Sequence, residues 1–149
     1  MIKAVLFDYD GVLVDSLELN YKGTCAVLRA AGAKEITFEE FCRDYEAPYT
    51  KFYKDRGITA TREETGKWYI EEILKYSDPP LTKGVIEVLK DLTKAGLVLG
   101  VVSTHGFLHL TKQLKKDSLI SFFRLVVGDQ EVKDIAITDF CGWFGFKPR

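Results

Sequence analysis

Two aspartates separated by a single residue follow an apolar run near the start of the chain. The run, Ile2 to Phe7, is interrupted only by Lys3 and leads directly into Asp8, Asp10 and Gly11. Two like charges held so close together favour a bridging cation. Mg²⁺ suits this pair, because it binds oxygen and often uses one or two carboxylates together with a substrate phosphate. Gly11 allows a sharp turn, which would leave backbone amides free to face an anion.

Three apolar runs predict the strands that position these aspartates. They span residues 2–7, 97–102 and 125–127. The first run has the pattern of a strand buried on both faces, and a helical pattern precedes each of the other two, which together predict a parallel sheet. In such a sheet, ligands bind beyond the carboxyl ends of the strands. We therefore expect a site that includes Asp8, Ser103 and Gly128, which follow the three runs.

Residues 17–78 carry helix signals but no pattern of a buried strand. The segments TFEE, residues 37–40, and TREE, residues 61–64, match helix capping boxes. Gly32 and Gly57 are typical helix stops, and the run Asp78-Pro79-Pro80 is a stiff boundary before the sheet pattern resumes. The prediction is an α/β fold with a Rossmann-like parallel-sheet core, residues 1–16 and 79–149, and a helical insert, residues 17–78.

Composition limits the classes of partner. The 149 residues are 46% hydrophobic and 29% charged, which is ordinary for a globular protein, and the formal net charge is -1. This balance does not suggest a nucleic-acid-binding surface, and the apolar runs are far shorter than the roughly 20 residues that span a bilayer. The three cysteines lack the spacing of a disulfide framework or a zinc site. We expect a reduced, cytoplasmic protein, and the composition leaves a small anionic ligand open.

The segment FDYDGVLVDS, residues 7–16, resembles the first motif of the haloacid dehalogenase superfamily of phosphatases and phosphotransferases. The resemblance implies that Asp8 attacks phosphorus to form an aspartyl phosphate, while Asp10 acts as general acid and base. It also implies that both aspartates take part in a magnesium site. Because Asp10 is acidic, the resemblance is to the phosphoryl-transfer branch rather than to the enzymes that hydrolyse carbon–halogen bonds.

The second motif of this resemblance is a hydroxyl residue at the end of the next core strand. Ser103 in LGVVST, residues 99–104, is the better match and would bind a phosphate oxygen. Thr104 and the amide of His105 would add donors where Gly106 begins a helix. His105 and His109 also stand four positions apart, on one face of a helix. Without a third ligand, a surface or capping role is favoured for this pair, although His105 is close enough to the motif to touch substrate.

The third motif is a lysine after the third strand, and Lys133 would neutralise the charges of phosphate and aspartate. The family often has Lys-Pro here, whereas this chain has Lys133-Asp134, and Lys147-Pro148 lies too far along for our first choice. The fourth motif, an acidic cluster that completes the magnesium site, is absent from these 149 residues. The chain is therefore expected to be a fragment or a naturally shortened member.

Two further expectations follow from the resemblance. Without the fourth strand the first strand would lie at an exposed apolar edge, which predicts self-association through that edge. The helical insert has the place and size of a cap that closes over the active site, with Arg43, Lys51 and Arg56 as candidate substrate contacts.

Our leading interpretation is a magnesium-dependent phosphatase acting on a small phosphate monoester, similar to phosphoglycolate phosphatases in its first motif and in the position of its cap. A sugar phosphomutase uses the same nucleophile and acid, and the motifs do not distinguish the two activities. Two other readings stay open. One is a signalling receiver domain, which normally lacks a helical insert after the first strand. The other is a shortened, non-catalytic chain that keeps the fold without turnover.

Overall fold

The computed structural model describes residues 2–46, 48–130 and 133–145. The chain divides into two compact units, Met1–Asp15 with Pro80–Arg149, and Ser16–Pro79. The domain boundaries expected from the sequence fall within one residue of this division. In the described part of the chain, none of the helices is long and apolar enough to cross a membrane.

The first unit is built on three parallel strands in the order β1-β2-β3. The strands are β1 (Ala4–Phe7), β2 (Val98–Val102) and β3 (Leu125–Val127). This sheet confirms the predicted α/β class. Phe7 pairs with Val101, and Val102 pairs with Val127, so the strands end almost level with one another. The residues that follow them are therefore brought together at one edge of the sheet.

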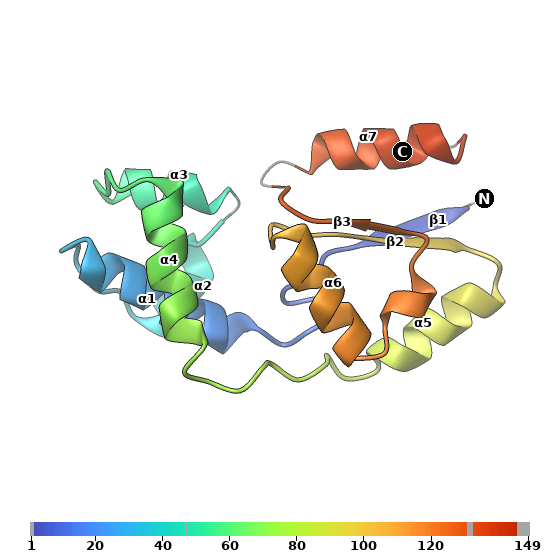
Figure 1. The fold of residues 1–149 in the computed structure, drawn as a ribbon, viewed down its shortest axis with the longest axis horizontal. Coiled ribbons are helices and arrows are strands. Elements are labelled where there is room, and N and C mark those ends of the chain that lie inside the picture. Colours follow the sequence, from blue (N-terminus) through green and yellow to red (C-terminus); the bar gives the residue numbers. More distant parts are fainter. Residues whose placement is uncertain (1, 47, 131–132, 146–149) are drawn as a thin grey trace. The chain divides into compact units, whose positions relative to one another are not determined.

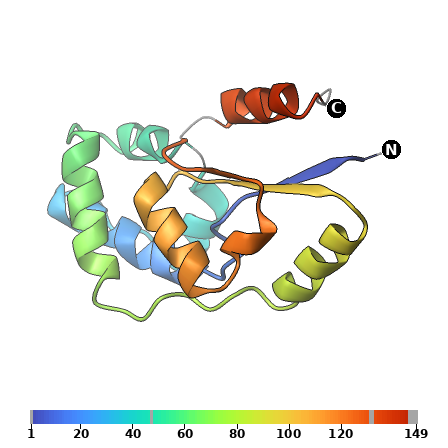
Figure 2. The ribbon, with the colours of Figure 1, turned by 45° about the vertical axis from the view of Figure 1, so that its right-hand side comes forward.

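Helices cover both faces of this sheet (Figures 1 and 2). Helix α7 (Asp134–Trp143) lies on one face, and α5 (Val85–Lys94) and α6 (Phe107–Lys116) lie on the other. A short 3-10 helix, η1 (Ile120–Phe122), precedes β3. Buried aliphatic side chains of α5, β2 and α6 form the core of this unit, including Leu89, Leu99, Val101, Leu110 and Leu114.

Strand β1 differs from its prediction as a strand buried on both faces. All four of its residues are only half-buried, whereas Leu99 to Val102 in β2 are buried. The physical reason is its place at the edge of the sheet: among the described residues, β2 is the strand that pairs with it. The apolar pattern that indicated complete burial therefore belongs to a strand that pairs with β2 alone in the described part of the chain.

The two chain segments that lead to the helical unit run side by side within the α/β unit. Val14 and Leu81 form an antiparallel bridge. The amide of Asp15 donates to the carbonyl of Pro80 at 2.9 Å, and the amide of Thr82 donates to the carbonyl of Leu13 at 3.0 Å. The entry and the exit of the helical unit are thus held together by backbone hydrogen bonds.

The second unit consists of α1 (Leu17–Ala30), α2 (Phe38–Asp44), α3 (Tyr49–Asp55) and α4 (Arg62–Ile73). Both predicted capping boxes are confirmed, with Thr37 and Thr61 as the N-cap residues. Gly32 and Gly57 follow the ends of α1 and α3 with φ of +69° and +74°, a conformation that glycine adopts without strain. These local signals explain why the ends of these helices could be placed from the sequence.

Helices α1 and α4 approach closely at a glycine. A methyl group at Gly23 would lie 2.4 Å from Cε2 of Tyr69, closer than side-chain carbons come. The hydroxyl of Tyr69 donates to Oδ1 of Asn20 at 2.6 Å, which holds the ring over Gly23. The absence of a side chain at Gly23 is therefore required by this helix contact.

Candidate active site

Asp8 and Lys133 form an ion pair at the end of β1. Oδ2 of Asp8 contacts the Nζ atom of Lys133, the N-cap residue of α7, while Oδ1 accepts a hydrogen bond from the amide of Tyr9 at 2.7 Å. The side chains of Asp8 and Lys133 are 39% and 27% exposed, so a small ligand can reach both. The structure thus brings together the candidate nucleophile and the candidate lysine.

Asp10 lies against His105. Nε2 of His105 is 2.8 Å from Oδ2 of Asp10, and its ring packs edge-on against Tyr9, with 5.6 Å between ring centroids. On its other side, the ring stacks on His109 at 5.1 Å. This environment corrects the expectation of a surface or capping role for His105, because the side chain is largely enclosed and paired with a site carboxylate. The aspartate partner lies 95 positions away in the sequence, so local pattern did not reveal it.

Opposing effects act on the pKa of His105. Burial alone would lower it, because the charged imidazolium loses solvation. The hydrogen bond to Asp10 and the negative charges of Asp10 and Asp8 outweigh burial, so the pKa of His105 is raised above its ordinary value. These contacts favour an imidazolium beside the Asp10 carboxylate.

Ser103 directly follows β2 and is completely buried. Its Oγ accepts a hydrogen bond from the amide of His105 at 3.1 Å, and its own amide donates to the carbonyl of Val127 at 2.9 Å. The hydroxyl retains its proton as a donor. The amide of His105, which we expected to face phosphate, is instead engaged with Ser103. Thr104, the other expected donor, is half-buried in the same loop.

Gly11 makes the predicted sharp turn, with φ of +69°. Its amide, however, donates to the carbonyl of Val14 at 2.9 Å, and the amides of Leu13 and Val14 donate to the carbonyl of Tyr9. The expectation that backbone amides of this turn face an anion is therefore wrong for these residues. The turn closes on itself and satisfies its own donors. A role for Gly11 in substrate binding stays a prediction that rests on the shape of the turn.

Asp129 is a contributor to this region that the motifs did not single out. Gly106 is the N-cap residue of α6, which agrees with the predicted helix start, but the amide of Phe107 donates to Oδ2 of Asp129 at 3.0 Å. This part of the helix start is therefore occupied by the chain's own carboxylate rather than open to phosphate. The sequence signal for this contact was the position of Asp129 directly after Gly128 at the end of β3, since aspartate caps helices and tolerates a left-handed conformation.

The three candidate cations of the helical unit already have partners within that unit. Arg43 contacts Asp44 at 2.7 Å, and Arg56 contacts the same carboxylate at 3.3 Å. Lys51 contacts Glu46 at 2.9 Å. A substrate would have to compete with these carboxylates. Substrate contact by Arg43, Lys51 and Arg56 therefore stays a prediction.

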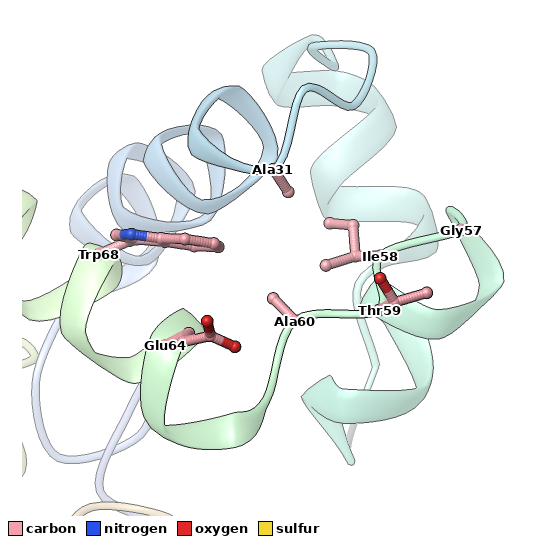
Figure 3. A pocket seen from close by; sticks show the side chains of 7 residues that line it. All are labelled: Ala31, Gly57, Ile58, Thr59, Ala60, Glu64 and Trp68. Carbon is pink, nitrogen blue, oxygen red and sulfur yellow. The ribbon is translucent and has the colours of Figure 1, made fainter.

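A cavity of about 450 Å³ lies within the helical unit (Figure 3). Its lining residues are Ala31, Gly57, Ile58, Thr59, Ala60, Glu64 and Trp68. The carboxylate of Glu64 and the ring of Trp68 lie on one side of it (Figure 3). None of the predicted catalytic residues lines this cavity. The residues predicted to be catalytic follow the strands of the other unit instead.

The donor chemistry of Asp8 and Asp10 fits a magnesium ion. Their carboxylates follow the same strand one residue apart, and hard oxygen donors are what this ion prefers. Within the described ranges, no group of three or more His, Cys, Asp or Glu side chains is arranged to hold a metal. Two carboxylates nevertheless suffice for Mg²⁺ when water and a substrate phosphate supply the remaining ligands.

The sequence matches a model of the haloacid dehalogenase-like hydrolase family over residues 5–135. The chain therefore belongs to this family, which confirms the resemblance of its first motif. Among curated proteins, it is 29% identical over 135 residues to the pyrophosphatase PpaX of Listeria innocua and 28% identical over 145 residues to PpaX of Listeria monocytogenes. In both comparisons the match covers 89% of this chain and 62% of the relative.

Solved structures share the fold. A protein from Bacteroides fragilis that was proposed to be a haloacid dehalogenase-like hydrolase matches 100% of this chain and 76% of its own, with a TM-score of 0.81 and 21% identity. A protein from Bacteroides vulgatus that was proposed to be a beta-phosphoglucomutase matches 99% of this chain and 65% of its own, with a TM-score of 0.74 and 27% identity.

Proposed function

We propose that this protein is a magnesium-dependent phosphatase that hydrolyses a small phosphate monoester. The observation that carries the proposal is the contact of Asp8 with Lys133 at the same sheet edge as the contact of Asp10 with His105. The proposed nucleophile, the proposed acid–base group and the lysine proposed to bind phosphate thus lie at one edge of the sheet. Family membership supports phosphoryl transfer as the reaction class.

The proposed reaction has two steps. In the first, a carboxylate oxygen of Asp8 attacks phosphorus, the bond to the leaving oxygen breaks, and Asp10 gives that oxygen the proton that the Asp10–His105 pair holds. In the second, Asp10 takes a proton from water, whose oxygen attacks phosphorus and releases Asp8 and inorganic phosphate. Lys133 and the hydroxyl of Ser103 bind the phosphoryl oxygens. A bound magnesium ion, held by Asp8 and Asp10, would neutralise charge on the phosphate.

In the proposed reaction, Lys133 reduces the repulsion between the Asp8 carboxylate and the phosphate. Its ammonium group already contacts Asp8, and an incoming phosphate brings more negative charge to the same place. Without a cation between them, the carboxylate and the phosphate would repel each other, which would oppose nucleophilic attack. His105 has a different part, because its contact with Asp10 holds the acid–base carboxylate at the site.

A sugar phosphomutase is the second candidate, favoured by the structural similarity to the protein from Bacteroides vulgatus. Both reactions share the attack by Asp8 and differ in whether water or a second substrate accepts the phosphoryl group. Supplying a sugar phosphate and analysing the products separates them. Inorganic phosphate indicates the phosphatase, whereas an isomeric sugar phosphate indicates the mutase.

Hydrolysis of p-nitrophenyl phosphate, with Mg²⁺ or with a chelator, tests the proposal. Inorganic pyrophosphate belongs in the same assay, because the curated relatives are named as pyrophosphatases. We expect magnesium-dependent turnover that Asp8→Asn reduces at least about 1,000-fold, as loss of a nucleophile does. Unchanged turnover in Asp8→Asn contradicts the mechanism. A folded sample without turnover favours the non-catalytic alternative for this chain.

The proposal also covers the surroundings of the site. We propose that the helical unit acts as a cap and contacts the substrate through Arg43, Lys51 and Arg56. We also propose that the protein works in the cytoplasm. The half-buried edge strand β1 supports pairing with a second copy of the chain, because unpaired strand edges recruit other strands. Light scattering across a concentration series tests this association, and a monomer at the highest concentration contradicts it.

A further inference from the structure

The loops that follow β2 and β3 are joined by several hydrogen bonds. The amide of Gln130 donates to the carbonyl of Ser103 at 3.0 Å, and the amide of Asp129 donates to the carbonyl of His105 at 2.7 Å. In the opposite direction, the amide of Phe107 donates to Oδ2 of Asp129 at 3.0 Å. Asp129 therefore contacts this backbone twice. Its amide donates to His105, and its carboxylate accepts from Phe107.

The backbone at Gly128 and Asp129 shows how closely the loops after β2 and β3 approach each other. Asp129 has a φ of +59°, in the left-handed region that side-chain-bearing residues seldom adopt. At the preceding residue, Gly128, a Cβ atom would lie 2.5 Å from the amide nitrogen of Phe107 and 2.7 Å from the carbonyl oxygen of His105. The two loops can approach this closely only with glycine at 128. Asp129 then turns its carboxylate to the first amide of α6.

The backbone that Asp129 holds carries the imidazole that contacts Asp10. The His105 ring reaches Oδ2 of Asp10 at 2.8 Å and packs edge-on against Tyr9. We propose that Asp129 is a positioning residue that fixes the Asp10 carboxylate through His105. This inference rests on the proposed function, in which Asp10 transfers the proton to and from the substrate.

A second effect follows from the same contact. A helix start with unengaged amides attracts anions, and the start of α6 lies in the loop that carries Ser103. By accepting from Phe107, the Asp129 carboxylate occupies that amide and places a negative charge beside it. This amide of the helix start is therefore not available to an anion.

Two variants separate the carboxylate from the backbone conformation. Asp129→Gly keeps the left-handed conformation and removes the contact to Phe107, whereas Asp129→Asn keeps an acceptor oxygen and tolerates the same conformation. With p-nitrophenyl phosphate, we expect kcat of Asp129→Gly to fall roughly 10- to 100-fold while KM changes by less than about 3-fold, because misplaced catalytic groups slow the chemical step. Asp129→Asn should stay within about 3-fold of wild type.

A structural readout tests the inference independently of turnover. The chain contains two histidines, so the His105 ring signals can be assigned with a His109→Gln variant. In wild type, a nuclear Overhauser effect between the rings of His105 and Tyr9 is expected from their 5.6 Å separation. It should disappear in Asp129→Gly and persist in Asp129→Asn.

The matched control removes a helix cap elsewhere. Thr37→Ala deletes the cap of α2 and should lower stability without moving the ring contact or kcat. The inference is overturned if Asp129→Gly keeps the ring contact, or if both variants lower kcat equally. A wild-type chain that shows the ring contact but no turnover contradicts the proposed function alone.

Discussion

The ammonium group of Lys133 contacts the carboxylate of Asp8, although 125 positions separate the two residues in the sequence. The parallel sheet produces this contact, because Asp8 follows β1 while Lys133 lies beyond β3 at the start of α7. In the proposed mechanism, the pair places a positive charge where an incoming phosphate meets Asp8. Its removal has consequences that can be measured.

Lys133→Met should weaken phosphate binding without unfolding the chain. The variant removes the charge but keeps a flexible side chain, and charge-assisted contacts contribute substantially to anion binding. We expect at least about a 10-fold higher inhibition constant for inorganic phosphate, with partial recovery in Lys133→Arg. Competition with p-nitrophenyl phosphate measures this constant. Lys90→Met on the exposed face of α5 is the control, and an equal effect there would contradict the assignment.

Magnesium should stabilise the α/β unit through Asp8 and Asp10. Binding to the folded state alone raises the free energy of unfolding by RT ln(1 + [Mg²⁺]/Kd), which is about 1.4 kcal/mol at ten times the dissociation constant. Thermal denaturation with MgCl₂, compared with NaCl at equal ionic strength, measures this gain. Asp8→Asn should abolish it, whereas Asp91→Asn on α5 should not. A gain that survives in Asp8→Asn places the ion elsewhere.

Gly23→Ala and Gly66→Ala should change stability in opposite directions. Alanine at Gly23 collides with the ring of Tyr69, whereas at Gly66, inside α4, a methyl group meets nothing within 4 Å. We expect Gly23→Ala to destabilise the helical unit by about 1–3 kcal/mol and Gly66→Ala to stabilise it by about 0.5–1 kcal/mol. Urea denaturation followed by circular dichroism provides both values. Similar stability in the two variants would show that the α1–α4 contact adapts easily.

The helical unit should lose stability in alkali through Tyr53. Burial raises the pKa of Tyr53 to about 12, above the ordinary value of 10.0. Between these values the unfolded chain releases the phenol proton before the folded chain does, so rising pH favours unfolding. At pH 11 the loss should be about 1.4 kcal/mol relative to pH 8. Tyr53→Phe should show correspondingly less alkaline sensitivity in denaturant titrations, and equal sensitivity contradicts this account.

The elements that can be predicted from the sequence are those whose signals are local. Both capping boxes and the Gly32 and Gly57 stops could be read directly, because each depends on residues within one helical turn. The ends of the apolar runs likewise located Asp8 and Ser103. These local features therefore predict much of the candidate site.

What could not be predicted depends on partners distant in the sequence. The partial enclosure of His105 depends on Asp10 and Tyr9, and the cap on α6 comes from Asp129 on another loop. The amide of Gly11 was expected to face an anion, but it bonds to Val14 because the turn closes on itself. A single sequence shows which residues could donate, but not which acceptors the fold brings to them.

The bridge between Val14 and Leu81 makes the helical unit separable in principle. Because the chain leaves the sheet and returns to it through adjacent, hydrogen-bonded segments, the core's path is nearly continuous without residues 16–79. An insertion with neighbouring ends can be lengthened, shortened or exchanged with little effect on the scaffold that carries it. The α/β unit and the helical unit can therefore change in sequence and in length at different rates.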